Sequence, residues 1–288
     1  MLRYNRNMNG SPLISVVTVC RNAAGCIGHA LETVMKQRDT EGVSFTNYEH
    51  IVIDGGSCDG TQDIVGAYKD TQEAHGISVT FTSQADEGIY DAMNKGLVLA
   101  KGCYVGFLNA DDWYASSALA TVTCLANGDA PDCIGGACRV VGRTPVPVDI
   151  RNARLEVLEA TYPRHMPVVH QSLFMRTDLL REVGGFRTEF PLAADYDLFL
   201  RLLKHSPNNR IEDKSGADTS QIHWAFTDEV LSYFALGGAS YHPIETARDY
   251  RKVRLANGWP WTMVWLLYVK NLGASWLARV GSMASHQV

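Results

Sequence analysis

The first 110 residues alternate short apolar segments with amphipathic ones, and this alternation restricts the fold more than any other feature of the sequence. Residues 13–19, 51–53, 77–81 and 104–108 are β-branched and apolar, as in buried strands, whereas the segments between them carry apolar residues at helical spacing. Strands that alternate with helices predict a mostly parallel sheet covered by helices on both faces. In such sheets ligands bind beyond the carboxyl ends of the strands, so the loops that follow the strands are the first candidate sites.

The pattern changes after about residue 130. Residues 133–140, 172–175 and 230–234 are typical of strands, residues 195–203 carry apolar residues at helical spacing, and the stretch around Pro147 looks irregular. No repeat or low-complexity linker separates the two parts. The sequence therefore predicts an α/β chain whose second, smaller half is α+β.

The composition excludes several classes of protein. The chain has 288 residues and a formal net charge of −5, so nucleic-acid binding would need a local basic patch, and the sequence shows none. Seven cysteines without a CxxC pair fit neither a disulfide framework nor a zinc cluster and indicate a reducing compartment. Residues 1–10 are too polar for a signal peptide, and no apolar run approaches the roughly 18 residues of a membrane span. We expect a cytoplasmic protein that is soluble or, at most, peripheral to a membrane.

Two adjacent carboxylates follow the fourth apolar segment, in the run Asn109-Ala110-Asp111-Asp112. Adjacent carboxylates repel each other unless a cation lies between them, and oxygen ligands favour Mg²⁺ or Mn²⁺, usually completed by substrate phosphates. The alternative is an acidic turn that caps a helix starting near Ser116.

A glycine-rich segment, residues 54–61, follows the second apolar segment. Its three glycines allow a ligand to approach the backbone, and Asp54 could accept a hydrogen bond from a base or a ribose. The alternative is a glycine-rich turn that ends with Asp59 as a helix N-cap. The chain contains no GxGxxG or GxxxxGK[ST] motif, so these phosphate-binding loops are excluded.

Further carboxylates lie on two predicted helices. Asp91 and Lys95 are four residues apart, so they form an i,i+4 salt bridge or, alternatively, Lys95 faces a phosphate. Asp195 and Asp197 begin the other helix. Asp195 is either an N-cap or a general base, and Asp197 is placed to pair with Arg201.

Five motifs in order make the chain similar to a known family. They resemble family 2 of the inverting glycosyltransferases, and the similarity runs from about residue 12 to about residue 240. Each motif is weak alone, but five in this order and spacing are specific. The motifs are Val16-Val17-Thr18-Val19 with Arg21-Asn22, Asp54-Gly55-Gly56-Ser57 with Asp59-Gly60-Thr61, Asn94-Lys95-Gly96, Gly106-Phe107-Leu108-Asn109-Ala110-Asp111-Asp112, and Gly184-Gly185-Phe186 followed by Ala194-Asp195-Tyr196-Asp197 with Arg201.

The resemblance implies the GT-A fold, which is Rossmann-like with a mostly parallel central sheet. On this basis we expect an N-terminal tail at residues 1–11 and a nucleotide-sugar-binding half at residues 12–130. The acceptor-binding and catalytic-base half would span residues 131–240, and a helical, aromatic-rich segment residues 241–288.

The resemblance also implies roles for individual residues. Asp54 would contact the nucleotide base, Asp111 and Asp112 would hold Mg²⁺ or Mn²⁺, and Asp195 would deprotonate the acceptor. His170 is a candidate contact to the acceptor or the diphosphate. The remaining residues expected to bind the nucleotide sugar are Arg21, Asn22, Asp91, Lys95, Asn109 and Asp111.

Three residues depart from the family's pattern. Asn109 stands where many members have the first Asp of the metal motif, Gly55 replaces the second Asp of Asp-Asp-Gly-Ser, and Ala194 replaces the Glu before the base. The first departure bears on the number of metal ligands. The last removes a neighbour that would raise the pKa of the base.

These features predict an inverting, metal-dependent transfer of a sugar from a nucleotide-diphosphate donor to a hydroxyl of a glycan or lipid-linked glycan. Such a reaction would serve surface polysaccharide assembly, in an exopolysaccharide, O-antigen or capsule. One alternative is a sugar-phosphate nucleotidyltransferase, although the glycine-rich basic loop usual after its first strand is missing here. The other is a non-catalytic nucleotide-sugar-binding scaffold. A homo-oligomer is compatible with each of these three functions.

The C-terminal region is rich in aromatic residues: four of the six tryptophans lie between Trp259 and Trp276. Tryptophan and tyrosine beside lysine and arginine favour a membrane–water interface, so residues 258–280 are a candidate membrane-surface contact. The alternative is that these side chains pack against the domain or a second subunit.

Overall fold

The computed structural model describes residues 12–142, 147–151, 168–205, 222–237 and 243–270. The expected N-terminal tail and part of the C-terminal segment, residues 271–288, lie outside the described residues. The described strands form one nine-stranded sheet in the order β3-β2-β1-β4-β8-β6-β9-β5, with β7 paired to β6. The strands are β1 (Ile14–Cys20), β2 (Tyr48–Asp54), β3 (Val79–Ser83), β4 (Tyr104–Asn109), β5 (Trp113–Tyr114), β6 (Cys133–Val141), β7 (Pro147–Arg151), β8 (Leu173–Arg176) and β9 (Trp224–Ala235).

The four strands at one end of the sheet are parallel, as the alternating pattern predicts. β3, β2, β1 and β4 pair in parallel, and β8 then pairs antiparallel with both β4 and β6. All seven residues of β1 and of β2 are buried, which explains why these strands do not alternate between apolar and polar residues. The GT-A fold expected from the sequence is confirmed, with a parallel first half and a mixed second half.

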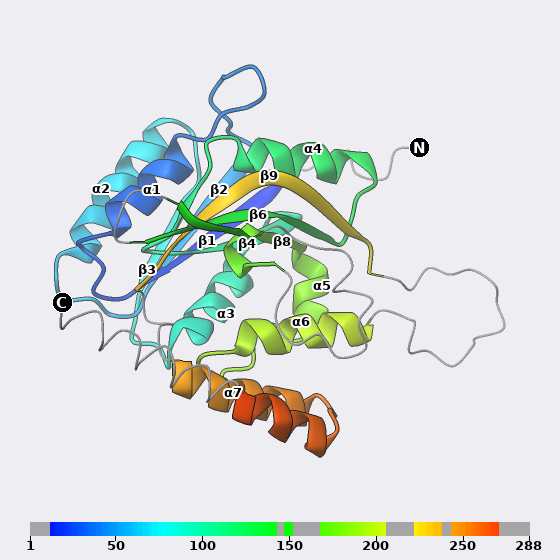
Figure 1. Cartoon of the computed structure of the whole chain (residues 1–288). Helices are drawn as coiled ribbons and strands as arrows, with labels where there is room; N and C mark the ends of the chain where they lie inside the picture. Colours follow the sequence, from blue (N-terminus) through cyan, green and yellow to red (C-terminus); the bar gives the residue numbers. More distant parts are fainter. Residues whose placement is uncertain (1–11, 143–146, 152–167, 206–221, 238–242, 271–288) are drawn as a thin grey trace, which may run out of the picture.

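Helices cover both faces of the sheet (Figure 1). The helices α1, α2 and α4 lie on one face, and α3, α5 and α6 on the other, with α7 packed outside α6. Their bounds are α1 (Ile27–Met35), α2 (Thr61–Ala74), α3 (Ile89–Leu99), α4 (Ala118–Gly128), α5 (Thr177–Glu182), α6 (Ala194–His205) and α7 (Pro243–Ala256), and a short 3₁₀ turn, η3 (His170–Ser172), precedes β8.

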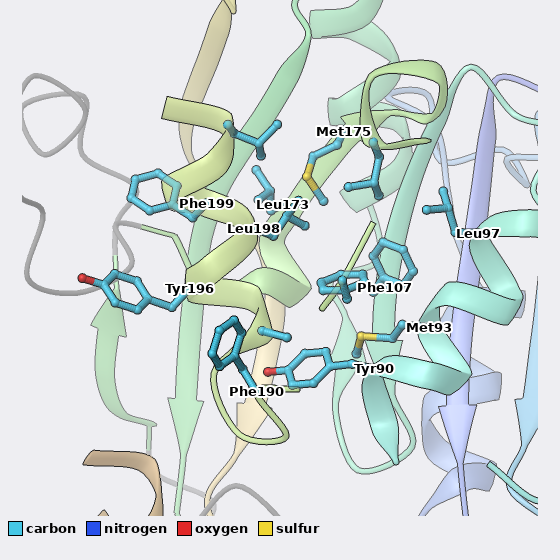
Figure 2. Close-up of a cluster of buried hydrophobic side chains, with 14 of the residues drawn as sticks. Tyr90, Met93, Leu97, Phe107, Leu173, Met175, Phe190, Tyr196, Leu198 and Phe199 are labelled. Carbon is cyan, nitrogen blue, oxygen red and sulfur yellow. The ribbon is translucent and has the colours of Figure 1, made fainter. Parts of the chain in front are cut away.

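The largest core cluster lies between the sheet and the second helical layer (Figure 2). Met93 of α3, Phe107 of β4 and Leu198 of α6 pack there, and Tyr90 directs its hydroxyl toward α6. Gly96 is needed at the crossing of α3 over the sheet, because a Cβ there would lie 2.3 Å from a methyl of Val17. This packing fixes α3 and α6 beside each other at the carboxyl ends of β1 and β4.

One element differs from the sequence prediction. The stretch around Pro147 is not irregular: residues Pro147–Arg151 form β7, antiparallel to β6, with a register shift between Val140 and Val141. Pro147 is the first residue of a strand that pairs only with β6 in the described part of the chain. At such a position the missing backbone N–H is tolerated, so the proline does not prevent a strand.

Within the described residues, no helix has the length and apolar character required to cross a membrane.

Candidate functional site

A cleft of about 350 Å³ opens at the carboxyl ends of β1 and β4, where α3 begins. This position is the switch point of the sheet, because the chain passes from β1 to β2 on one side and reaches β4 on the other. Four of the predicted residues line the cleft together: Arg21, Asn22, Asn109 and Asp111. The sequence interpretation did not select Cys26, Asp86 and Phe234, which also line it.

Asp54 lies behind the cleft. Its side chain has no exposed surface, and its oxygens accept hydrogen bonds from the Ser57 backbone N–H (2.9 Å), the Ser57 hydroxyl and the Ser83 hydroxyl (2.6 Å). Burial raises the pKa of Asp54, but the hydrogen bonds from Ser57 and Ser83 outweigh it and the pKa is lowered overall. The expected contact with a nucleotide base does not fit this arrangement, because the carboxylate is enclosed by Ser57 of its own loop and Ser83 of β3.

Asn22 ties the loop after β1 to the loop after β2. Its backbone N–H donates to the Ser57 hydroxyl (2.7 Å), and its side-chain carbonyl accepts from the Cys58 backbone N–H (3.1 Å). Asn22 has a φ of +48°, a left-handed conformation that asparagine tolerates better than most residues. The two loops that close this end of the cleft are therefore fixed to each other through Asn22 and, via Ser57, to Asp54.

Gly55, one of the three departures from the family's pattern, leaves room for another carboxylate. A Cβ at Gly55 would lie 2.3 Å from the Asp86 Oδ2, and 3.2 Å from the Arg21 side chain. Asp86 lines the cleft, and its Oδ1 accepts from the Gly88 backbone N–H at 3.0 Å. The carboxylate that faces the cleft on this side is thus Asp86, supplied by the loop before α3.

Asp91 and Lys95 form the i,i+4 salt bridge that was one of their two interpretations, with 2.9 Å between Lys95 Nζ and Asp91 Oδ2. Lys95 also donates to the Ala85 carbonyl (3.1 Å), and Asp91 accepts from the Glu87 backbone N–H (3.1 Å). Neither residue lines the cleft. The pair therefore holds the backbone on both sides of Asp86, at Ala85 and at Glu87.

The two adjacent carboxylates after β4 have different environments. Asp111 lines the cleft, whereas Asp112 is 1% exposed and accepts from Gln171 Nε2 (2.5 Å) and the Ala235 backbone N–H (2.9 Å). Asn109 also donates its side-chain amide to Asp112. The sequence assigned both carboxylates to a metal. In the structure only Asp111 reaches the cleft, because Asp112 is held inward by β9 and η3.

Negative charge accumulates at this loop. Burial, and then the Asp111 charge, raise the pKa of Asp112 to about 7, and burial raises the pKa of Asp111. The pKa of the Cys26 thiol is also raised, by burial and then by the charges of Asp111 and Asp112. In the described part of the chain no three His, Cys, Asp or Glu side chains are grouped to hold a metal ion. A divalent cation fits the charge here, with its other ligands coming from phosphate oxygens and water.

Asp195 lies in the first turn of α6, beside a void of about 10 Å³ that is lined mostly by apolar core side chains. Its Oδ1 accepts from the Tyr90 hydroxyl (3.0 Å) and from the Tyr196 backbone N–H (2.8 Å), and its side chain is 22% exposed. The helix begins at Ala194, so Asp195 is inside its first turn and not at the cap. The carboxylate is thus oriented by α3 but open on one side.

Asp197 is the other carboxylate in the first turn of α6 that could act as the general base, but its side chain has no exposed surface. It pairs with Arg201 (2.7 Å), as predicted, and accepts from Asn257 (2.8 Å), while Arg187 lies 3.6 Å away. A carboxylate with these partners is committed to the packing of α6 against α7, which leaves Asp195 as the accessible one.

His170 stands between the two groups of carboxylates. Its Nδ1 is 3.7 Å from Asp195 Oδ2, and its buried Nε2 has no hydrogen-bond partner among the described residues. Burial lowers the pKa of His170, and the charges of Asp195 and Asp111 partly oppose that effect. The ring is therefore neutral near pH 7 and close to both Asp111 and Asp195.

Comparisons with known proteins agree on one family. The family model of glycosyl transferase family 2 matches residues 15–183. The chain is 30% identical over 204 residues to an uncharacterized glycosyltransferase of Mycobacterium tuberculosis, covering 67% of this chain and 70% of the relative. It is 27% identical over 194 residues to a PGL/p-HBAD biosynthesis glycosyltransferase of Mycobacterium bovis, covering 66% and 70%.

A solved structure supports the fold. The mannosyltransferase PcManGT from Pyrobaculum calidifontis, in complex with GDP-Man and Mn²⁺, is similar with a TM-score of 0.56 and 20% sequence identity. The similarity covers 95% of this chain and 81% of that chain.

Proposed function

The chain belongs to glycosyl transferase family 2 and is a glycosyltransferase, and from this premise we propose that it inverts the anomeric centre of a nucleotide-diphosphate sugar as it transfers the sugar to an acceptor hydroxyl. The observation that carries the proposal is the placement of an open carboxylate, Asp195, beside the cleft that holds Asp111, with His170 between them.

We call the cleft lined by Arg21, Asp86 and Asp111 the donor side. Its volume of about 350 Å³ suits a nucleotide sugar, since small-ligand pockets start at about 300 Å³. Asp86 is the carboxylate available to the base or ribose. Asp54 acts indirectly, because it holds the loop that Asn22 and Ser57 join. The similarity to a protein solved with GDP-Man supports a nucleotide-sugar donor.

Asp111 is the residue that would hold a Mg²⁺ or Mn²⁺ ion against the donor diphosphate. Such an ion, when bound, neutralises the charge that develops on the leaving nucleoside diphosphate. Asp112 acts as a positioning residue: it fixes the loop to β9 through the Ala235 N–H, and to η3 through Gln171. The presence of Mn²⁺ in PcManGT supports this assignment.

We call the partly exposed carboxylate of Asp195, together with His170, the acceptor side. The acceptor hydroxyl must lose its proton as it attacks the anomeric carbon, and Asp195 can accept that proton. Tyr90 orients Asp195 by donating to Oδ1, which leaves Oδ2 for the acceptor. No covalent intermediate with the enzyme is needed, so the configuration inverts. His170 Nε2, buried and unpartnered among the described residues, is positioned to contact the acceptor or diphosphate.

The acceptor class that fits this family is a glycan or lipid-linked glycan, in the assembly of a bacterial surface polysaccharide or glycolipid. The similarity to a PGL/p-HBAD biosynthesis enzyme supports that class. The cytoplasm is the compartment proposed for the reaction, because seven free cysteines suit a reducing environment.

Release of free nucleoside diphosphate from a panel of UDP- and GDP-sugars tests the proposal, with Mn²⁺, with Mg²⁺ and with excess chelator. We expect release from at least one donor, loss of release in chelator, and a fall of about 10²–10⁴-fold in Asp111→Asn. Full release in chelator would remove the metal from the mechanism. Pyrophosphate release from a nucleoside triphosphate and a sugar phosphate would instead indicate a nucleotidyltransferase. Binding of a nucleotide sugar without turnover, with or without glycan acceptors, would indicate a scaffold.

A further inference from the structure

The helix at residues 261–270 is apolar on all sides although only one side is packed. It lies beside α7, on the side of the molecule away from the sheet (Figure 1). Val264 and Leu267 face the core, with 0% and 7% exposure. On the outer side Trp261, Leu266 and Val269 are 64%, 72% and 62% exposed. At 100° per residue these three fall within an arc of about 140°, so they form one face.

This face is unusual within the described part of the molecule. Eight large hydrophobic side chains are exposed among the described residues, and four of them lie between residues 255 and 269: Leu255, Trp261, Leu266 and Val269. Scattered apolar side chains are ordinary on a soluble protein, but a contiguous group marks an interaction surface. We call the group formed by Trp261, Leu266 and Val269 the apolar face.

A basic pocket adjoins the apolar face. It has a volume of about 420 Å³, and Arg248, Arg251 and Lys252 of α7 line it together with Trp265 and Tyr268 of the helix 261–270. The Arg251 guanidinium lies 5.2 Å from the centroids of both aromatic rings, and its buried Nε has no hydrogen-bond partner among the described residues. Stacking holds this cation in place at the wall of the pocket, where a guanidinium suits a phosphate oxygen.

Two acidic residues also line the pocket, Glu245 and Asp249. Asp249 is 4% exposed, and its oxygens are used by the Leu192 backbone N–H (3.0 Å) and by Lys252 (3.1 Å). Residues 243–270 contain five basic and two acidic side chains, a net charge of +3, whereas the whole chain carries −5. The local charge is therefore opposite to that of the molecule.

We propose that the apolar face and the basic pocket dock the enzyme on an anionic lipid bilayer. Trp261, Leu266 and Val269 enter the interface, and a lipid phosphate group contacts Arg248 and Arg251. Exposed tryptophan and leucine next to arginine and lysine are the combination that binds interfacial helices to anionic lipids. The proposal adopts the first of the two interpretations that the sequence left open for residues 258–280, of which residues 271–280 lie outside the described residues.

The charge argues against a second copy of the chain as the partner. A two-fold dimer would bring the same surface from each copy together. Because Arg254 is buried, each surface would present four basic and two acidic side chains of residues 243–270, so two regions of net positive charge would face each other. An anionic bilayer supplies the opposite charge to the same surface.

The position of the pocket connects docking to the reaction. Leu192 lines the basic pocket and precedes Asp195 by three residues, so their Cα atoms are at most about 11 Å apart. An acceptor anchored in the membrane would then present its hydroxyl near Asp195. This last step rests on the proposed function, whereas docking itself does not.

Cosedimentation with vesicles of phosphatidylcholine alone, and with 30% phosphatidylglycerol added, as in roughly physiological anionic surfaces, tests docking in the full chain without any nucleotide sugar. We expect binding to the anionic vesicles that weakens with salt. The double variant Trp261→Glu, Leu266→Glu should lose at least about tenfold in vesicle affinity, since both side chains would carry charge into the interface. Arg248→Glu should also weaken binding to anionic vesicles.

The matched control is Val98→Glu, which places the same charge at an exposed apolar position on α3 (76% exposed) and should bind as the wild type does. Circular dichroism and light scattering check folding and oligomeric state, and quenching of tryptophan fluorescence by brominated lipid reports insertion in the wild type itself. Absence of binding to anionic vesicles would overturn the proposal, as would an equal loss in Val98→Glu. A wild-type dimer that becomes monomeric in the double variant would also overturn it, since a second copy would then cover the face. Donor turnover in solution should be unchanged by the double variant, so the docking result is independent of the proposed reaction.

Discussion

On the donor side, Asp54 has no exposed surface and its oxygens are occupied by Ser57 and Ser83. On the acceptor side, Asp195 is 22% exposed, and its Oδ1 accepts a hydrogen bond from the Tyr90 hydroxyl. Both residues are aspartates that the family resemblance marks as functional. Their surroundings separate them. A carboxylate whose oxygens are occupied by protein hydroxyl and N–H groups shapes a site, whereas one with a free oxygen can accept a proton from a substrate.

The strongest test of this comparison is Asp195→Asn. Asparagine keeps an acceptor for the Tyr90 hydroxyl but cannot take the acceptor proton, so transfer should fall by about 10²–10⁴-fold. Nucleotide affinity, measured by calorimetry, and melting temperature should remain unchanged. Glu189→Gln, an exposed residue in the loop before α6, is the matched control and should retain full activity. Collapse of nucleotide affinity in Asp195→Asn would place this residue on the donor side.

Asp54→Asn should behave in the opposite way. The amide cannot accept from Ser57 and Ser83 as a carboxylate does, and we expect a loss of about 1–3 kcal/mol in the free energy of unfolding. Because the folded-state pKa of Asp54 is lowered, its contribution is present above the ordinary pKa near 3.8 and is lost as the pH falls below it. Denaturant unfolding measures the change, with the exposed Asp70→Asn on α2 as control. An unchanged stability would break the comparison.

Asp86→Asn tests whether Asp86 contributes to binding of the donor. This carboxylate lines the cleft where Gly55 makes room for it, so the variant should weaken donor binding about tenfold, the effect of one lost charge-assisted hydrogen bond. Titration of the nucleotide sugar into the variant gives the affinity. If the affinity stays at the wild-type value, the base and ribose lie elsewhere in the cleft.

Tyr90→Phe tests whether the Tyr90 hydroxyl orients Asp195. Removing the hydroxyl that donates to Asp195 leaves the base less well oriented, and we expect a three- to tenfold fall in kcat with the donor KM unchanged. Steady-state kinetics separates the two constants. A rise in donor KM of the same size, with kcat intact, would show that Tyr90 serves binding and not the base.

The smallest expected effect concerns the stability of the protein in acid, through a buried histidine of β2. His50 is fully buried between Thr18 (2.8 Å) and Tyr68 (2.7 Å), and burial lowers its pKa from 6.5 to about 3. A histidine with a lowered folded-state pKa contributes stability that is complete above pH 6.5 and is lost as the pH falls from 6.5 toward 3. Between pH 7.5 and 5.5 the loss is about 1 kcal/mol. His50→Gln, which keeps hydrogen-bonding groups, should unfold with a smaller pH dependence, and an identical pH dependence would contradict the assignment.

Much of the donor side could be predicted from the sequence, because its residues follow strands directly. The apolar segments that become β1 and β4 place Asn22 and Asp111 at the same edge of the sheet, and parallel pairing brings them into one cleft. Which carboxylate faces the cleft was not predictable. Asp54 and Asp112 are turned inward by Ser83 and Ala235, which lie 29 and 123 residues farther along the chain.

The acceptor side depended more on long-range packing. The local pattern indicated a helix near Asp195 and the Asp197–Arg201 pair, both of which the structure contains. It gave no sign that Tyr90, 105 residues earlier, holds Asp195. Asp86 carried a signal that could have been used, since Gly55 in place of an acidic residue suggests that another carboxylate fills the space.

The configuration of the first-formed sugar tests the central claim most directly. Time-resolved proton NMR of slow donor hydrolysis by the wild-type enzyme, or of transfer once an acceptor is known, records the anomer before mutarotation. If Asp195 activates the incoming oxygen for direct displacement, an α-linked donor should yield the β-anomer first. Initial formation of the α-anomer would contradict the account, because retention requires either a covalent intermediate or attack from the side of the leaving group.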